Sequence, residues 1–226
     1  LVLNPFLLKT KPENQAGRRA LNLLHSWDGH VTMQSRAAAI FNVWLNYINQ
    51  ALVPKGLYKL TNKPIFLYVL NALRNQDCHF AAASTCHLLL TQTLQTTVTQ
   101  LQNKFGRNMN QWQWRYLHRA DFENNSLGKS PWLGWIWNRQ IAAPGDYLTI
   151  NVGTYSLEKF HQIHGAGYRE VISLGNFDHS RYIMPMGESG NPMSRFYQNL
   201  LRRWRDGRYI QIDGINLHKS RVLYLR

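Results

Sequence analysis

Apolar residues recur at helical spacing through the first half of the chain. Two long stripes step by three or four positions: Ala37, Phe41, Trp44, Ile48 and Leu52, then Leu90, Leu94, Val98, Leu101 and Phe105. Glycine or proline comes soon after three of the four helical stretches (Gly29, Pro54 and Gly106), as expected where a helix ends, and Asn75-Gln76-Asp77 breaks the pattern after the other. We therefore predict helices from about residue 16 to 27, from a cap at Thr32 or Ser35 to residue 52, from Pro64 to about Arg74, and from about Thr85 to Phe105.

The second half has shorter apolar runs separated by turn residues, a pattern typical of strands. We predict strands over residues 147–152, 168–174, 181–186, 209–212 and 222–225, and one helix over 192–206. Helices followed by strands indicate an α+β fold. We expect a helical region over 1–107 and a strand-rich region over 108–226, which together make one structural unit.

Tryptophans crowd the middle of the chain, with Trp112, Trp114, Trp132, Trp135 and Trp137 inside 26 residues of sequence. They suit either an aromatic platform for sugars or bases or the packing of a loop-rich region over the sheet. We favour packing.

The net charge of the whole chain is +14. Arginine and lysine are dense near the end: Arg195, Arg202, Arg203, Arg205, Arg208, Lys219, Arg221 and Arg226. One interpretation is a basic module that binds nucleic acid or an anionic surface. We favour a solvated face, or one that docks on an acidic partner segment, because no nucleic-acid-binding motif accompanies the cluster.

No run of about 18 apolar residues indicates a membrane span. The first residues have neither the leading positive charge nor the cleavage site of a signal peptide. Because the first residue is Leu1, we expect the chain to begin inside a longer gene product.

The two cysteines, Cys78 and Cys86, lack the C-x-x-C spacing of metal or redox sites. On a continuous helix they would lie about 12 Å apart along the axis, which is too far for a disulfide. A bridge therefore requires a loop across residues 75–85. We predict that loop and the bridge, and with them an oxidising compartment; two free buried cysteines are the alternative.

The residues themselves offer no catalytic constellation. His161 and His164 form an H-x-x-H pair without the glutamate of the H-E-x-x-H zinc motif, so we expect hydrogen bonding rather than metal binding. Ser189 lies between glycines but not in the G-x-S-x-G pattern of a nucleophile elbow, so we expect a turn there. We therefore predict no catalytic residue and no metal ligand within this chain.

Several spaced segments resemble one known family. The order HGAGYR (164–169), a short strand, an FDHS turn (177–180) and MGESGNP (186–192) is similar to the C-terminal end of the penicillin acylase family. WDGHVTMQSRAAAIFNVWL (27–45), QWQWRYLHRADF (111–122) and the PGD-x-x-T-x-N pattern from Pro144 to Asn151 resemble the same family. The resemblance covers about residue 20 to about residue 207.

The resemblance implies the C-terminal part of a β chain within an αββα sandwich of an N-terminal-nucleophile hydrolase, with helices first and mostly antiparallel strands after them. In this family a precursor is cleaved, and the new N-terminal residue of the β chain, usually serine, attacks an amide with its own α-amino group as base. That nucleophile and the family's calcium site would lie upstream of Leu1, so this chain alone is expected to be inactive and to need no cofactor.

The resemblance further implies a periplasmic or secreted parent that removes an acyl group from a penicillin, a cephalosporin or an N-acyl homoserine lactone. The expected partners are the remaining α and β segments of the same precursor and the small-molecule amide; nucleic acid is not expected. His164, Tyr168 and Arg169 are the candidates for substrate binding, although Arg169 also suits pairing with a buried carboxylate. A degenerate acylase that serves as an inactive scaffold is a further alternative.

Overall fold

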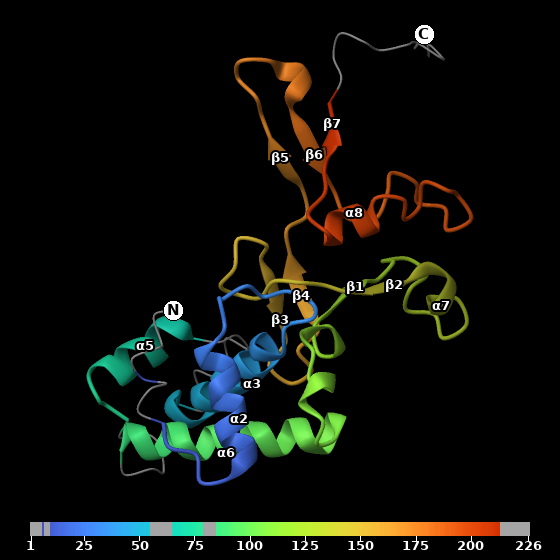
Figure 1. Cartoon of the computed structure of the whole chain (residues 1–226). Helices are drawn as coiled ribbons and strands as arrows, with labels where there is room; N and C mark the ends of the chain where they lie inside the picture. The colour runs from blue at the N-terminus through green and yellow to red at the C-terminus, as the bar shows by residue number, and fades with distance from the viewer. Residues whose placement is uncertain (1–5, 7–9, 55–64, 79–84, 213–226) are drawn as a thin grey trace, which may run out of the picture. The chain divides into compact units, whose positions relative to one another are not determined.

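The computed structural model describes residues 6, 10–54, 65–78 and 85–212 (Figure 1). The chain divides into two compact units. The first comprises Leu1–Asp121 and Gln140–Gly165, and the second comprises Phe122–Arg139 and Ala166–Arg226. Within the described ranges, no helix is long and apolar enough to cross a membrane.

The first unit contains the helices that the sequence predicts. They are α2 (Gln15–His25), α3 (Arg36–Leu52), α5 (Phe66–Arg74) and α6 (Cys86–Phe105), followed by the short 3-10 turns η1 (Met109–Gln111) and η2 (Trp114–Tyr116). The Ser35 hydroxyl accepts a hydrogen bond from the Ala38 amide at 3.0 Å, so Ser35 is the cap of α3. Thr85 caps α6 in the same way, and Gly106 ends it. Pro64 lies outside the described residues.

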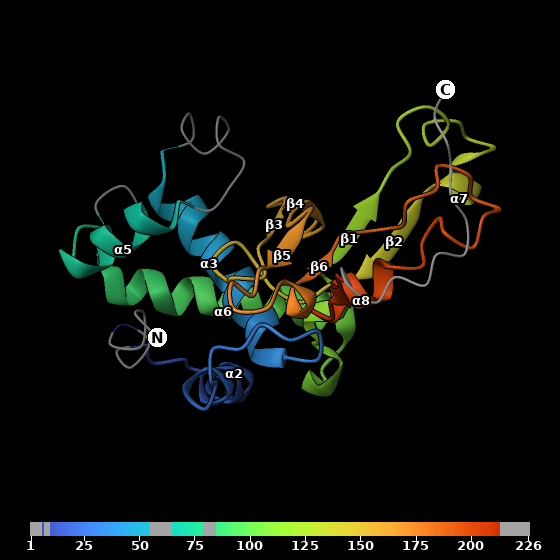
Figure 2. The same ribbon diagram turned by 90° about the horizontal axis from the view of Figure 1, so that it is seen from above.

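The hydrophobic core of the first unit is built around α3, which packs against α2, α5 and α6 (Figure 2). Ile40, Val43 and Trp44 are almost fully buried, and so are Leu94 and Val98 of α6. The Trp44 indole donates to the Thr93 hydroxyl at 3.0 Å, so the ring is buried without losing its hydrogen bond. Both apolar stripes therefore face a shared core, as their spacing predicts.

A four-stranded sheet adjoins these helices in the order β2-β1-β4-β3. The strands are β1 (Arg119–Phe122), β2 (Arg139–Ala142), β3 (Gly153–Tyr155) and β4 (Gln162–Gly165). β3 pairs antiparallel to β4, with a bulge between Thr154 and Tyr155, whereas β1 pairs parallel to β4 through Ala120 and Gln162. The sequence pattern did not predict β1, β2 or β4.

The predicted strand over residues 147–152 is wrong, because side chains take up the backbone groups that a strand would need. The Leu148 amide donates to the Asp146 carboxylate at 2.8 Å, and the Asp146 amide donates to the Thr149 hydroxyl at 2.9 Å. These bonds close a turn, as aspartate and threonine commonly do. Ile150 is left exposed, and the strand starts only at Gly153.

The second unit contains a three-stranded antiparallel sheet in the order β5-β6-β7. Its elements are α7 (Gly134–Trp137), β5 (Arg169–Val171), η3 (Phe177–His179), β6 (Arg181–Ile183), α8 (Leu201–Arg205) and β7 (Ile210–Gln211). β5 and β6 confirm two predicted strands and β7 a third, each shorter than the apolar run suggests. The predicted strand over 222–225 lies outside the described residues.

The predicted helix over 192–206 is wrong in its first half; only α8 is helical. Asn191 and Ser194 again offer side-chain acceptors, to the amides of Met193 at 3.0 Å and Phe196 at 3.2 Å. The Leu200 amide donates to the Met186 carbonyl at 2.8 Å, which bends the segment back on the strand end. Local polar bonds thus compete with the helix.

A disulfide joins Cys78 to Cys86, with their Cα atoms 5.3 Å apart. Both cysteines are buried against the core of the helices. The chain between them, 79–84, lies outside the described residues.

The central tryptophans divide between two environments. Trp112 and Trp114 are fully buried, as expected from packing, whereas Trp132 and Trp135 in the second unit are 83% and 79% exposed. Packing therefore accounts for only part of the tryptophan-rich segment.

Candidate functional site

The buried face of α3 carries three asparagines, Asn42, Asn46 and Asn49, which we call the asparagine stripe. Each is buried, and each reaches a segment outside α3. The Asn46 amide donates to the Leu157 carbonyl at 2.9 Å, and the Asn49 side-chain oxygen accepts from the Ile65 amide at 3.0 Å. Because buried amides are costly unless hydrogen-bonded, the stripe fixes where these segments lie on the helix.

Asn42 makes the central contact of the stripe. Its Nδ2 donates to the Asp146 carboxylate at 3.3 Å and to the Ala38 carbonyl at 3.0 Å, and its Oδ1 accepts from the Tyr155 hydroxyl at 2.7 Å. Tyr155 belongs to β3, and Asp146 belongs to the turn before that strand. One amide therefore holds both the strand and its preceding turn against the helices.

Gly145 is what allows Asp146 to enter the interior. Its φ is +84°, and a Cβ there would lie 2.0 Å from the Asn151 carbonyl oxygen. Only glycine fits this combination of backbone conformation and close approach. The Gly145 carbonyl also accepts the Trp114 indole N–H at 2.8 Å, which ties the turn to η2.

Burial raises the pKa of Asp146, since its carboxylate is only 2% exposed and its charged form loses hydration. Hydrogen bonds from Leu148 and Asn42, and the nearby His118, oppose that rise. The Asp146 carboxyl is therefore hydrogen-bonded inside the core, with one donor to each oxygen, rather than presented to solvent.

His118 is the second buried titratable group of this region. Its Nδ1 lies 2.9 Å from the Ala143 carbonyl oxygen and its Nε2 lies 3.0 Å from the Gly153 carbonyl oxygen. The ring stacks on Trp114, with centroids 4.8 Å apart and planes at 6°. His118 thus spans the ends of β2 and β3.

Burial lowers the pKa of His118, and the two carbonyl contacts oppose this effect. A neutral imidazole has one N–H and can donate to only one of the two carbonyls. Asp146 also favours the charged ring, whereas His161 disfavours it. With burial the largest influence, the pKa of His118 lies below its ordinary value, and the ring braces the strands through its two carbonyl contacts.

An exposed polar cluster lies at the edge of the same sheet. The Asp121 carboxylate is 3.0 Å from His161 Nδ1 and accepts a hydrogen bond from the Gln140 side-chain amide at 2.5 Å. An aspartate that orients a histidine is one part of a general-base arrangement. In the described part of the chain, however, no serine or threonine hydroxyl is bonded to a histidine ring, and no cysteine is free.

Metal binding finds no support among the residues that the structure describes, which contain no group of three histidine, cysteine or acidic side chains able to hold an ion. The Nδ1 atom of His161 contacts the Asp121 carboxylate, and His164 is exposed on β4.

The three predicted substrate-binding residues fall in different units. His164 is in the first unit, whereas Tyr168 and Arg169 are in the second. Tyr168 is exposed and its ring stacks on Tyr182, with centroids 5.9 Å apart. The Arg169 guanidinium donates to the Trp204 carbonyl at 3.0 Å and lies over the Trp204 ring, so its contacts are to Trp204 rather than to a carboxylate.

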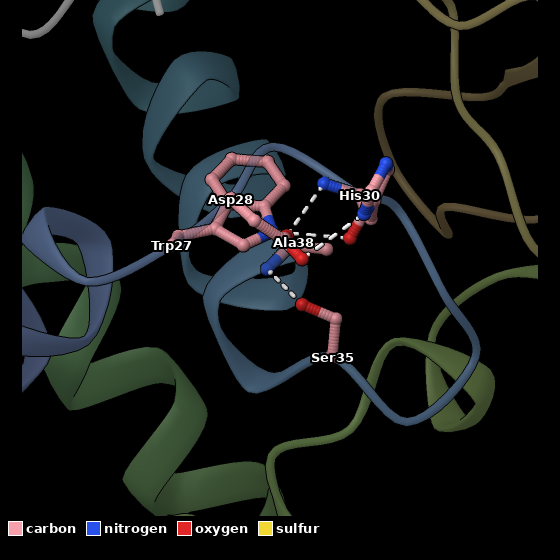
Figure 3. A network of polar contacts seen from close by, with 5 residues as sticks. All are labelled: Trp27, Asp28, His30, Ser35 and Ala38. Atoms are coloured by element: carbon pink, nitrogen blue, oxygen red, sulfur yellow. Dashed lines mark hydrogen bonds and ion pairs between the residues drawn. The ribbon is translucent and has the colours of Figure 1, made fainter.

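The Trp-Asp-Gly motif forms a compact turn between α2 and α3 (Figure 3). The Trp27 indole donates to the His30 carbonyl at 3.0 Å, and the Asp28 carboxylate accepts from the His30 amide at 2.8 Å. Trp27 also packs on Phe41 of α3, with ring centroids 5.3 Å apart. Asp28 and His30 are exposed, so this motif shapes the entry to α3.

The sequence pattern alone does not mark the asparagine stripe, Asp146 or His118 as site residues. One signal was present: Asn42, Asn46 and Asn49 recur at spacings of four and three inside a helix whose neighbouring positions are apolar. Polar residues at core spacing indicate buried hydrogen bonds to another segment. For Asn42 and Asn46 that segment is residues 144–157, about 100 positions away, which carries no local sign of the pairing.

Comparison with known proteins gives a consistent result. The family model described as penicillin amidase matches residues 2–214. Acyl-homoserine lactone acylase QuiP of Pseudomonas syringae pv. syringae is 29% identical over 219 residues, which cover 88% of this chain and 27% of that protein. Penicillin acylase 2 proenzyme of Pseudomonas sp. is 26% identical over 200 residues, covering 81% of this chain and 25% of that protein.

Among solved structures, thermostable penicillin G acylase from Alcaligenes faecalis matches with a TM-score of 0.56 at 16% identity. The match covers 100% of this chain and 46% of that chain. Likeness at this identity shows a shared fold. The chain spans about a quarter of the length of the two curated relatives above.

Proposed function

The chain belongs to the penicillin amidase family, and on this premise we propose that it is the C-terminal part of the β chain of an amide-cleaving acylase. The observation that carries the proposal is the family match over residues 2–214, in a chain with only about a quarter of the length of its acylase relatives. In this proposal the α chain and the earlier β segments of the same precursor are its partners.

The proposed reaction uses groups that lie upstream of this chain. The N-terminal nucleophile, usually serine, attacks the carbonyl carbon of the substrate amide while its α-amino group takes the hydroxyl proton. Donors upstream hold the oxyanion, the amine leaves with a proton, and water then hydrolyses the acyl-enzyme. The calcium site is proposed to lie upstream as well, and this chain alone is proposed to be inactive.

The contribution proposed for this chain is to complete and brace the sheets. The asparagine stripe, Asp146 and His118 tie β3 and its preceding turn to a helical core, through bonds that are almost entirely buried. Such a rigid support helps keep catalytic groups within the narrow tolerance that acyl transfer requires. These residues are positioning residues.

For the substrate, an N-acyl homoserine lactone is the class we propose first, with penicillins and cephalosporins next. The support is that a relative named acyl-homoserine lactone acylase and a relative named penicillin acylase each match over most of this chain. An oxidising compartment, periplasmic or extracellular, is proposed because the structure has a disulfide between Cys78 and Cys86.

His164 and Tyr168 remain candidates for substrate contact, because both side chains are exposed. Arg169 is half-buried and engaged with Trp204, so we propose that it acts by holding the start of β5. In the assembled parent, His164→Ala and Tyr168→Phe are expected to raise KM with little change in kcat. An unchanged KM in both variants would remove these residues from the substrate site.

The proposed function is tested by expressing the whole precursor and following its maturation by mass spectrometry. We expect cleavage into two chains, with the new N-terminal residue acylated when a slow amide substrate is trapped. Changing that residue to alanine is expected to abolish acylation while the sheets still form. A precursor that stays intact, or that forms no acyl-enzyme, would contradict the proposal.

A further inference from the structure

A cavity of about 450 Å³ lies in the first unit, away from the asparagine stripe. It is bounded by α2, by the first residue of α3 and by the segment that follows α6. The lining residues are Arg19, Asn22, Leu23, Ser26, Arg36, Arg107, Asn108, Met109 and Asn110. This volume falls within the usual range for small-molecule sites.

The lining combines three arginines with amide side chains and no acidic residue. The ion pairs formed among the described residues do not involve Arg19, Arg36 or Arg107. Arg19 and Arg107 are exposed and Arg36 is partly buried. Guanidinium geometry matches carboxylate and phosphate oxygens. Three guanidinium groups that line one hollow without a carboxylate therefore favour an anionic occupant.

Arg36 is held in place within this cavity. Its Nη1 donates to the Asn110 side-chain oxygen at 2.7 Å. The backbone N–H of Asn110 in turn donates to the Asn108 side-chain oxygen at 3.0 Å. Arg36 is also the first residue of the 17-residue helix α3, where the helix dipole favours negative charge. The fork of Arg36 is thus partly preorganised, which lowers the entropy lost on binding.

From these observations we propose that this cavity, the arginine cavity, is a binding site for a small multivalent oxyanion carrying phosphate or carboxylate groups. Partly buried Leu23 and Met109 add an apolar contact for the carbon part of such a ligand. The site is separate from the amide-cleaving function proposed above and does not depend on it.

The test is isothermal titration calorimetry of the chain with inorganic pyrophosphate and with citrate, at about 0.1 M salt to suppress long-range attraction. We expect saturable one-to-one binding of at least one of them; pyrophosphate binding more tightly identifies phosphate as the preferred group, and citrate binding more tightly identifies carboxylate. Removing two cavity charges with R19Q/R107Q is expected to weaken binding at least about tenfold, as the loss of charge-assisted hydrogen bonds implies.

The matched control is R18Q/R74Q. It removes the same two charges from exposed positions on α2 and α5 that do not line the cavity. Because the chain carries a net charge of +14, general attraction of anions would weaken equally in both double variants. We expect the control to bind within about twofold of the unmodified chain, since its cavity contacts are intact.

An NMR titration of the unmodified chain tests the same site without depending on whether the variants fold. In an NMR titration with pyrophosphate or citrate, the side-chain amides of Asn22, Asn108 and Asn110 are expected to shift in a saturable way. Equal weakening in both double variants, no saturable binding with a Kd of about 1 mM or tighter, or shifts confined to other asparagines would overturn the proposal.

Discussion

Asn42 near the middle of α3 donates from its Nδ2 to the buried carboxylate of Asp146 at 3.3 Å, across 104 residues of sequence. The same amide accepts the Tyr155 hydroxyl through its Oδ1. A single side chain therefore connects the early helices to the later turn and strand. The contact explains why an otherwise apolar helix carries polar residues on its buried face.

Replacing Asn42 with leucine is expected to lower the free energy of unfolding by about 1–3 kcal/mol, the usual cost of leaving a buried polar group without its partner. Asp146 loses a donor, and the Tyr155 hydroxyl loses this acceptor. Urea unfolding followed by circular dichroism measures the change. Asn71→Leu is the control, because Asn71 is exposed on α5. A loss as large in Asn71→Leu as in Asn42→Leu would contradict the role assigned to Asn42.

Glycine at 145 is expected to be far harder to replace than glycine at 106, although both have a positive φ. Gly145→Ala places a Cβ 2.0 Å from a backbone oxygen, whereas a Cβ on Gly106 meets nothing within 4 Å. A sparsely populated backbone conformation with positive φ costs roughly 1–3 kcal/mol by itself, so Gly106→Ala is expected to show about that loss and Gly145→Ala clearly more. Equal melting temperatures for the two variants would refute the close approach.

His118 is expected to remain neutral in the folded chain at pH values where a free histidine is already charged. Burial lowers its pKa below the ordinary histidine value of 6.5, so the unfolded chain takes up the proton first. This part of the stability is therefore complete above pH 6.5 and declines as the pH falls toward the folded pKa. NMR titration of the His118 ring is expected to give a midpoint below that of a free histidine.

Unfolding measurements at several pH values give a second check on His118. Asp146 acts in the opposite direction, because its raised pKa adds stability as the pH falls. The comparison is therefore between the unmodified chain and His118→Gln, in which the histidine contribution is missing and the pKa of Asp146 is no longer lowered by His118. Parallel stability curves for the two proteins between pH 5 and pH 7 would exclude a buried, neutral His118.

Reduction of the Cys78–Cys86 bridge is expected to lower the free energy of unfolding by about 2–3 kcal/mol, because the bridge closes a short loop in the unfolded chain. Urea unfolding with and without a reductant measures this difference. The variant C78A/C86A serves as the control and is expected to be insensitive to reductant. Two alkylatable thiols in the unreduced, unfolded chain would show that the bridge does not form.

The helical half of the fold is predictable from sequence because its information is local. The stripe from Leu90 to Leu101 faces the core, and the caps at Ser35 and Thr85 lie next to the helices that they begin. A side chain that ends or begins a helix acts on amides three positions away, so the signal and its effect share one short stretch of sequence.

The strands were harder to predict, because the residues that decide them act over longer distances or compete locally. Residues 147–152 have an apolar pattern, yet the Asp146 and Thr149 side chains bend them into a turn. β1 and β4 contain only four residues each, and their parallel pairing brings together positions that are about 40 apart. No short-range pattern records such a pairing.

The candidate site was only partly visible from sequence for the same reason. The resemblance marked the segments containing Asn42, His118 and Asp146, but the contacts of these residues run between segments. The helical spacing of Asn42 indicates a buried amide, and the sequence at Asp146 indicates a turn. Neither pattern indicates which residue the side chain contacts. Only the folded chain shows that they meet.

The central claim is that this chain supplies the supporting part of an amide-cleaving acylase and not its reactive group. The most direct measurement is acyl release from an N-acyl homoserine lactone, followed by chromatography, for the chain alone and for the chain co-expressed with the preceding segments of its precursor. The account predicts release by the assembly and none by the chain alone. Hydrolysis by the isolated chain, or an assembled and matured protein that releases no acyl group from this substrate or from a penicillin, would contradict it.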